Sequence, residues 1–219
     1  MLPNILTSTQ EKILRIIGNA DKLRERFYLT GGTALAGFYL GHRYSEDLDF
    51  FSFEEVDPIG VEVFLKTHKS EIGFDSFEYQ QSLNRNLYFL QFGEEELKME
   101  FTYFPFTQIE KPMEEQGLRI DSRQDIAVNK LFTIYQRSAA RDYIDLYLLC
   151  KKEGYAIKDL LSKARVKFDW HIDPLQLGSQ FYKANEVADM PRLITDLKPE
   201  LWRGFFTEEA ENLKESIVE

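Results

Sequence analysis

The chain has 219 residues, of which 43% are hydrophobic and 14% aromatic, and its formal net charge at pH 7 is −10. A chain of this length and composition can bury a sizeable core, so we expect one large domain or two small lobes. The acidic balance argues against a general nucleic-acid coat protein, whose surface would be basic, but it allows a local basic track. The single cysteine, Cys150, excludes a disulfide framework and fits a reducing compartment.

The sequence shows no signal for export or membrane insertion. Its start has no cationic segment followed by an apolar core, which a signal peptide requires. No apolar run approaches the roughly 18 residues of a membrane span. We therefore expect a cytoplasmic protein that has no membrane partner.

The first part of the chain is predicted to contain a helix and two short strands. Residues 8–26 carry their apolar side chains on one helical stripe, with Ser8 or Thr9 as the N-cap. Residues 27–30 predict the first strand, and a glycine pair and a brief helix follow it. A second strand then carries two aspartates in the pattern D-x-D.

The middle of the chain changes from a helical to an alternating period. A helix is predicted from Asp57-Pro58 to about residue 72, with the proline in its first turn. Alternating apolar residues in 74–103 predict three strands joined by two turns, and Phe104-Pro105-Phe106 is predicted to end the sheet. The patterns beyond are helical.

The glycine pair and the D-x-D pattern combine into a candidate nucleotide site. Gly31 and Gly32 follow a strand, so the backbone there can approach a ligand closely and present its N–H groups to phosphate. The positive end of the next helix points to the same place. Side chains alternate along a strand, so Asp47 and Asp49 point to one face, with Leu48 buried opposite. Two such carboxylates repel each other unless a hard cation lies between them, and Mg²⁺ shared with substrate phosphates is the usual one.

This stretch resembles the signature of the DNA polymerase β-like nucleotidyltransferase superfamily, in which a glycine turn precedes a D-x-D strand. The pattern G-G-T-A-L…G-H-R-x-S-x-D-L-D-F-F is most similar to that of the AbiEii/AbiGii toxin branch. The residues that carry the resemblance are Gly31, Gly32, Thr33, Ala34, Leu35, His42, Arg43, Ser45, Asp47 and Asp49. The resemblance implies a nucleotidyltransferase that depends on Mg²⁺ or Mn²⁺, and the toxin half of a toxin–antitoxin or abortive-infection pair.

Glu100 is the candidate for a third metal ligand. It lies on the polar face of a predicted strand whose other face carries Met99 and Phe101. Without a D-x-D nearby, a solvated strand glutamate would be the simpler interpretation. The superfamily takes its third carboxylate from a later neighbouring strand, so the resemblance favours Glu100 over Glu96, although aspartate is the commoner residue there.

Three cations follow in a segment that contains no proline or glycine. On an unbroken helix Lys130, Arg137 and Arg141 would lie within roughly 40° of one another, at about 100° per residue. Such a stripe suits triphosphate binding, by a lysine point charge and two arginine forks. There are two alternatives: a solvated basic face paired with local acidic residues, and a helix that breaks near Ser138-Ala139-Ala140.

The same segment is similar to the AbiEii block K-x-x-A-L-x-x-R-x-x-x-R-D-x-x-D-L-x-x-L, apart from Thr133-Ile134 in place of Ala and Leu. The resemblance implies that Lys130 binds the nucleotide and that Asp142 or Asp145 is a catalytic or structural acid. Asp145 lies in an apolar stretch, so it must be paired if it is buried. An ion pair with Arg141, one helical turn away, is the structural alternative to a catalytic role.

Each candidate residue has a predicted role. The carboxylates Asp47, Asp49 and Glu100 would hold one or two metal ions, and Lys130 and Asp145 complete the predicted catalytic set. Nucleotide binding is predicted for the glycine turn and nearby polar and cationic side chains: Gly31, Gly32, Thr33, Arg43, Ser45, Lys130, Arg137 and Arg141. Arg43 also follows a predicted helix end, where the helix dipole alone would favour a cation.

The sequence thus predicts an α/β (α+β) fold. A small, mixed, mostly antiparallel sheet with flanking helices would occupy residues 1–120, and a helical lobe residues 121–219. The predicted reaction moves a nucleoside monophosphate from an NTP to an RNA, such as tRNA, or to a protein. The alternatives are a kinase-type phosphotransferase and an NTP-binding module without catalysis. A cognate antitoxin is a further predicted partner.

Overall fold

The structure is a computed structural model that describes residues 1–2 and 4–218. Residue 3 of the first predicted lobe and residue 219 of the second lie outside the described residues. The chain divides into two compact units, Met1–Thr107 with Lys111–Asp121, and Gln108–Glu110 with Ser122–Glu219. The chain therefore passes between the units after Thr107, after Glu110 and after Asp121.

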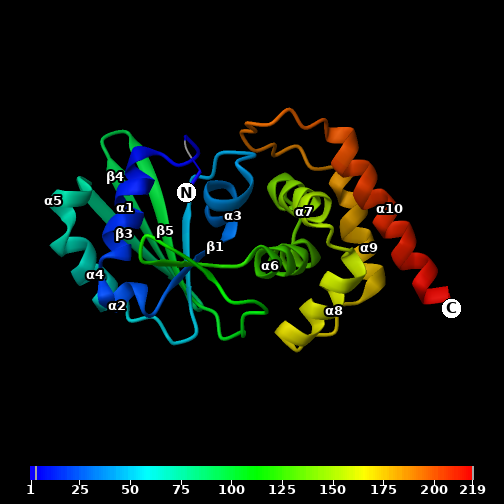
Figure 1. Ribbon diagram of the computed structural model, residues 1–219, viewed down its shortest axis with the longest axis horizontal. Helices are drawn as coiled ribbons and strands as arrows, with labels where there is room; N and C mark the ends of the chain where they lie inside the picture. The colour runs from blue at the N-terminus through cyan, green and yellow to red at the C-terminus, as the bar shows by residue number, and fades with distance from the viewer. Residues whose placement is uncertain (3, 219) are drawn as a thin grey trace. The chain divides into compact units, whose positions relative to one another are not determined.

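The N-terminal unit contains a seven-stranded sheet in the order β3-β4-β5-β2-β1-β7-β6 (Figure 1). Its strands are β1 Tyr28–Thr30, β2 Leu48–Ser52, β3 Ser76–Ser82, β4 Arg85–Phe92, β5 Glu95–Tyr103, β6 Met113–Glu115 and β7 Leu118–Ile120. β1 is parallel to β7 and β2 is parallel to β5, whereas the other neighbouring strands are antiparallel. The predicted mixed, mostly antiparallel sheet with flanking helices is confirmed.

Short helices flank this sheet. They are α1 Ser8–Gly18, α2 Asp21–Arg24, α3 Gly31–Leu35, α4 Pro58–Thr67 and α5 Lys69–Ile72, and α3 continues into a π-helix, η1, at Ala36–Leu40. Figure 1 shows α4 and α5 on one side of the strands and α3 on the other.

The two faces of the sheet differ in chemistry because side chains alternate along each strand. Phe50 of β2 and Phe101 of β5 are buried on one face, where their rings stack with centroids 5.1 Å apart. The hydroxyl of Tyr88 on β4 donates to the carbonyl of Pro58, so α4 covers this apolar face. The opposite face of β2 and β5 is therefore available for polar side chains.

Two predictions about the helices of this unit are corrected. The N-cap of α1 is Thr7, upstream of both predicted candidates, because Thr7 and Gln10 form a reciprocal capping box. The helix predicted over residues 57–72 is interrupted at His68. The ring Nδ1 of His68 lies 3.0 Å from the carbonyl oxygen of Phe64, so the side chain contacts the last turn of α4 where the helix ends.

A hairpin of β6 and β7 extends the sheet, so the predicted end at Phe104-Pro105-Phe106 is wrong. Gln116 and Gly117 join the two strands, and both have a positive φ, of 53° and 76°, as a type I′ hairpin turn requires. β7 then pairs with β1 through Leu29 and Ile120. Each of the two strands has three residues, too few for an alternating pattern to be recognised.

The C-terminal unit is helical. Its helices are α6 Arg123–Gln136, α7 Ala140–Glu153, α8 Ile157–Phe168, α9 Pro174–Tyr182, the 3₁₀-helix η2 Lys183–Asn185 and α10 Pro199–Val218. Trp202 of α10 is fully buried and stacks on Tyr143 of α7, with ring centroids 6.2 Å apart. None of the helices that the structure describes has both the length and the hydropathy of a membrane span.

The short segment 108–110 is held in this unit by Asp125 of α6. The Asp125 carboxylate accepts hydrogen bonds from the N–H groups of Ile109 and Glu110, at 2.8 and 3.0 Å. It also pairs with the buried ammonium of Lys167 on α8 at 2.7 Å. A buried carboxylate needs such partners, so Asp125 ties the segment to both helices.

α6 and α7 are separate helices, so the prediction of one cationic stripe along an unbroken helix is wrong. α6 ends at Gln136, and Arg137 has an extended backbone, with φ −150° and ψ 164°. The N–H of Ala140 at the start of α7 donates to the Asp189 carboxylate at 3.0 Å, a long-range contact that fixes the new helix start. The alternative prediction, a break near Ser138-Ala139-Ala140, is confirmed.

Candidate active site

The turn between β1 and α3 places two glycines against polar side chains. Gly31 has a φ of +72°, and a Cβ on it would lie 2.5 Å from Oδ2 of Asp49. A Cβ on Gly32 would lie 2.4 Å from a guanidinium nitrogen of Arg43 and 2.9 Å from Oγ of Ser45. Any larger residue would displace these groups. Five of the predicted site residues are therefore brought together at this turn.

Gly31→Ala should reduce both stability and activity. A Cβ at this position forces the Asp49 carboxylate to move, and the left-handed backbone disfavours alanine by about 1–2 kcal/mol. We expect the free energy of unfolding in urea to fall by about 1–3 kcal/mol, and nucleotide transfer to fall about ten- to a hundredfold. Gly93→Ala is the matched control, because its φ is +63° but no atom lies within 4 Å of the added Cβ. An equal loss of activity in both variants would contradict the close approach of Gly31 to a functional carboxylate.

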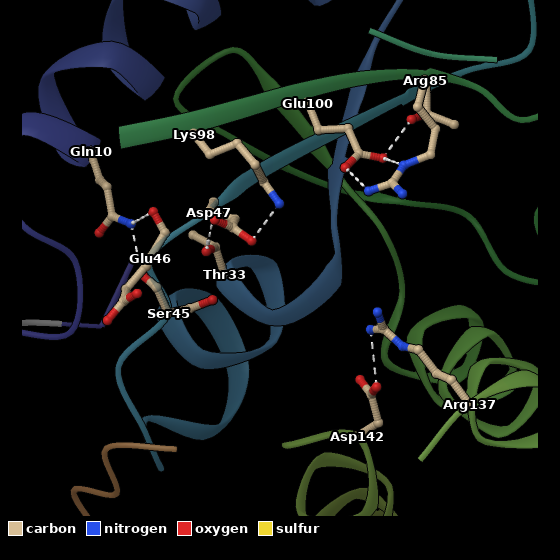
Figure 2. A network of polar contacts seen from close by, with 11 residues as sticks. Gln10, Thr33, Ser45, Glu46, Asp47, Arg85, Lys98, Glu100, Arg137 and Asp142 are labelled. Atoms are coloured by element: carbon tan, nitrogen blue, oxygen red, sulfur yellow. Dashed lines mark hydrogen bonds and ion pairs between the residues drawn. The ribbon is translucent and has the colours of Figure 1, made fainter. Parts of the chain in front are cut away.

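Asp47 is held immediately before β2, which begins at Leu48 (Figure 2). Its carbonyl accepts a hydrogen bond from the buried hydroxyl of Thr33, in the first turn of α3. Its carboxylate pairs with Nζ of Lys98 on β5 at 2.7 Å. Thr33 was predicted to bind phosphate, and in the structure its hydroxyl positions Asp47.

Gln10 of α1 fixes the loop that leads to Asp47. Its buried side chain donates from Nε2 to the carbonyls of Ser45 and Glu46, at 2.7 and 3.3 Å, as Figure 2 shows. Its Oε1 accepts from the N–H of Thr7 at 2.9 Å, so one amide joins the start of α1 to the loop. Gln10 is not among the predicted residues, although its place three residues after Thr7 is the signal of a capping box.

Asp49 and Glu100 are register partners on the adjacent parallel strands β2 and β5. The Glu100 carboxylate is bound by Arg85 of β4 through two N–H groups, at 2.7 and 2.5 Å, and accepts from the hydroxyl of Thr102 at 2.7 Å (Figure 2). Burial raises the pKa of the Glu100 carboxyl, but the bonds from Arg85 and Thr102 outweigh burial and hold the pKa below its usual value. Glu100 therefore carries a negative charge at neutral pH.

The three carboxylates suit a hard divalent cation in chemistry, but each has a different environment. Asp47 and Asp49 provide oxygen ligands on a partly exposed surface, and the ammonium of Lys98 pairs with the Asp47 carboxylate. Glu100 is occupied by Arg85. Among the described residues, no three His, Cys, Asp or Glu side chains converge closely enough to hold a metal. Asp47 and Asp49 thus fit a metal that replaces Lys98, and the role of Glu100 as third ligand stays a prediction.

Asp121 is a buried acid beside the glycine turn and is not among the predicted site residues. Its Oδ2 accepts from the hydroxyl of Thr30, the last residue of β1, at 2.8 Å. Its N–H donates to the carbonyl of Leu29 at 2.9 Å, and its carbonyl accepts from the hydroxyl of Tyr39 at 3.0 Å. Asp121 therefore secures the end of β1 directly before Gly31. No local pattern indicates this role, because its partners lie far away in the sequence.

In the C-terminal unit, Lys130 is held between two buried aspartates. Its Nζ lies 2.6 Å from Oδ1 of Asp142 and 2.7 Å from Oδ2 of Asp145. Arg137 contacts Oδ2 of Asp142 at 3.1 Å, as Figure 2 shows. Burial raises the pKa of the Asp142 carboxyl, but the charges of Lys130 and Arg137 outweigh it and lower the pKa below its ordinary value. Lys130, Asp142 and Asp145 form a buried cluster, and the exposed Arg137 at its edge brings the formal net charge of the four residues to zero.

The remaining predicted cations have separate environments. Arg141 is exposed on α7, and the ion partner that the structure gives Asp145 is Lys130 rather than Arg141. Arg43 is buried and donates to the carbonyl of Tyr44 at 2.9 Å, beside Gly32. Because helix α6 ends before Arg137, Lys130 and Arg141 belong to different helices.

Comparison with known protein families assigns the chain to one of them. The sequence model described as "Nucleotidyl transferase AbiEii toxin, Type IV TA system" matches residues 12–215, which is most of the chain. The chain belongs to this family. The predicted AbiEii family is confirmed, and with it the predicted class of enzyme, a transferase of nucleotidyl groups.

A relative and several solved structures are similar to this chain. An uncharacterized protein of Aquifex aeolicus, aq_aa25, is 31% identical over 156 residues, a match that covers 65% of this chain and 66% of that protein, slightly under two thirds. JHP933 from Helicobacter pylori has a TM-score of 0.63 at 23% identity, covering 96% of this chain and 92% of that one. MenT4, the nucleotidyltransferase toxin Rv2826c from Mycobacterium tuberculosis H37Rv, has a TM-score of 0.62 at 16% identity, covering 94% and 82%. At these identities the two structures establish the shared fold.

Proposed function

We propose that this AbiEii-family chain transfers a nucleoside monophosphate from an NTP to an acceptor hydroxyl on an RNA or a protein. The observation that carries the proposal is the contact between the D-x-D segment and the glycine turn. Asp49 lies against Gly31, and Asp47 is fixed by Thr33 of the same turn. A pair of carboxylates beside a helix start provides both a metal-binding surface and backbone N–H groups for phosphate.

The residues of the N-terminal unit have distinct tasks in this proposal. Asp47 and Asp49 would hold Mg²⁺ or Mn²⁺. The bound metal would lower the pKa of the acceptor hydroxyl and neutralise charge on the leaving pyrophosphate. The N–H groups of the glycine turn would bind the phosphates. Glu100 and Arg85 add one negative and one positive charge beside the aspartates, and the guanidinium fixes the direction of the Glu100 carboxylate.

The residues of the C-terminal unit are proposed from family resemblance. Lys130 would bind the nucleotide and Asp145 would act as an acid in catalysis, with Arg137 and Arg141 as further phosphate-binding candidates. The structure gives Lys130 two aspartate partners within its own unit, which supports a fixed, charged lysine. Release of Lys130 toward a phosphate would leave the two buried aspartates without it, so the position of Lys130 is also structural.

The family description adds a biological role to the proposal. A type IV toxin–antitoxin family suggests that this chain is the toxin and that a cognate antitoxin opposes it. The net charge of −10 disfavours a long RNA acceptor unless basic residues form a local track.

The test is to incubate the protein with Mg²⁺, a cell extract and each NTP labelled in turn at the α- and at the γ-phosphate. We expect label from the α-position to appear on a macromolecule, and Asp47→Asn to abolish it, because Asp47 is a proposed metal ligand. Label transferred only from the γ-position would contradict the proposal and indicate a kinase. Saturable NTP binding without transfer of either label would favour a binding module without catalysis.

A further inference from the structure

Lys98 is a cation on the polar face of β5 that has no role in the reaction proposed above. Its Nζ lies 2.7 Å from Oδ2 of Asp47, and the two side chains are 24% and 30% exposed. Figure 2 shows Lys98 and Glu100 reaching from β5 to the same face, as residues two positions apart in a strand do. The ammonium is therefore held among the carboxylates.

The ammonium pairs with the same Asp47 carboxylate that is proposed to bind the metal. Mg²⁺ binds carboxylate oxygens at about 2.0–2.1 Å. An ammonium and a divalent ion on the same carboxylate would repel each other strongly at such short range. Metal binding at Asp47 and the ion pair with Lys98 are therefore in competition.

We propose that Lys98 alternates between two partners: it neutralises Asp47 in the resting enzyme, leaves when the aspartates bind a divalent cation, and then binds the triphosphate of the NTP. This inference rests on the proposed function, because it needs Asp47 to be a metal ligand. It makes Lys98 a substrate-binding residue of the D-x-D face.

The contacts of Lys98 suit such an exchange. Ion pairs with this degree of exposure contribute about 0–1 kcal/mol to stability, so a divalent cation can displace the ammonium at little cost. A lysine is a point charge on a flexible stem and can reach a phosphate oxygen without a fixed approach. Arg85 on the neighbouring strand is different, because its two parallel hydrogen bonds to Glu100 fix its geometry.

The direct test is the rate at which acetic anhydride labels Lys98 in the full-length protein, measured for each lysine by mass spectrometry. The protein is labelled alone, with Mg²⁺, and with Mg²⁺ plus an equimolar mixture of the four nucleoside α,β-methylene triphosphates, which resist transfer of the α-phosphate. We expect Mg²⁺ alone to raise the rate at Lys98 about two- to fivefold, and the triphosphates to lower it again. Lys66 is the internal control, because it pairs with Glu62 at 2.8 Å away from the D-x-D face. An unchanged rate at Lys98 in protein that binds Mg²⁺ would overturn the proposal.

A second measurement separates this proposal from the proposed function. Binding of Mn²⁺ without nucleotide is followed by the electron paramagnetic resonance of the free ion. Lys98→Met should bind Mn²⁺ about two- to fivefold tighter than wild type, Lys66→Met should be unchanged, and in an Asp47→Asn background the Lys98 substitution should have no effect. Tightening that persists without Asp47, or no tightening at all, overturns the exchange. If Asp47→Asn itself binds Mn²⁺ like wild type, the proposed metal site is wrong and both proposals fail.

Discussion

Asp49→Asn is expected to lower nucleotide transfer by about three orders of magnitude, because an amide keeps the shape of the side chain but removes the charge that holds the metal. Stabilisation of charge by a bound metal is worth several kcal/mol, and about 4 kcal/mol corresponds to a thousandfold change in rate. The measurement is single-turnover transfer of α-labelled phosphate at saturating NTP and Mg²⁺.

The variant should remain folded. Asp49 is only half-buried, and asparagine keeps the shape of its side chain. Asp21→Asn is the matched control, because the Asp21 side chain is 75% exposed and pairs with Arg24 on α2. Transfer by Asp49→Asn above about a tenth of the wild-type rate, against the predicted thousandfold loss, would refute Asp49 as a metal ligand.

Lys130→Met is expected to lower the free energy of unfolding of the C-terminal unit by about 3–5 kcal/mol, because it removes the buried cation that pairs with two buried carboxylates. Asp142 and Asp145 are at most 1% exposed and both pair with the Lys130 ammonium. The two tryptophans of the chain, Trp170 and Trp202, both lie in this unit, so urea unfolding followed by tryptophan fluorescence reports on it directly.

Two further variants make this result specific. Lys158→Met replaces an exposed lysine of α8 and should leave stability within about 0.5 kcal/mol of wild type. The triple variant Lys130→Met/Asp142→Asn/Asp145→Asn neutralises the whole buried cluster. It should recover much of the lost free energy of unfolding, because none of the three buried charges remains. A loss below about 1 kcal/mol in Lys130→Met would mean that solvent reaches the aspartates and that the cluster is not a structural one.

The local part of the candidate site could be predicted because its residues are close in sequence. The two strands, the glycine turn and the D-x-D pattern lie within residues 28–52, where the alternation of a strand and the freedom of glycine are visible directly. Strand periodicity also predicted the polar face of Glu100, which the register of β2 and β5 places beside Asp49.

The parts that could not be predicted depend on contacts between distant residues. The partners Lys98 and Arg85 follow from strand order and register, which a sequence pattern does not specify. No proline or glycine marks the end of α6 at Gln136 in the sequence, and the start of α7 is fixed by the distant Asp189. The three-residue strands β6 and β7 are stabilised by pairing rather than by their own composition.

The way segment 108–110 is anchored limits how this protein can be divided by genetic engineering. The polypeptide leaves the first unit after Thr107, contributes three residues to the second, and returns for Lys111–Asp121 before leaving again. Expression of the helical part from Ser122 onward would deprive Asp125 of both its backbone donors, Ile109 and Glu110. Chimaeras between family members should therefore exchange 108–110 together with the helices. Each unit is compact but is built from two separate stretches of the sequence, so no single cut yields either one complete.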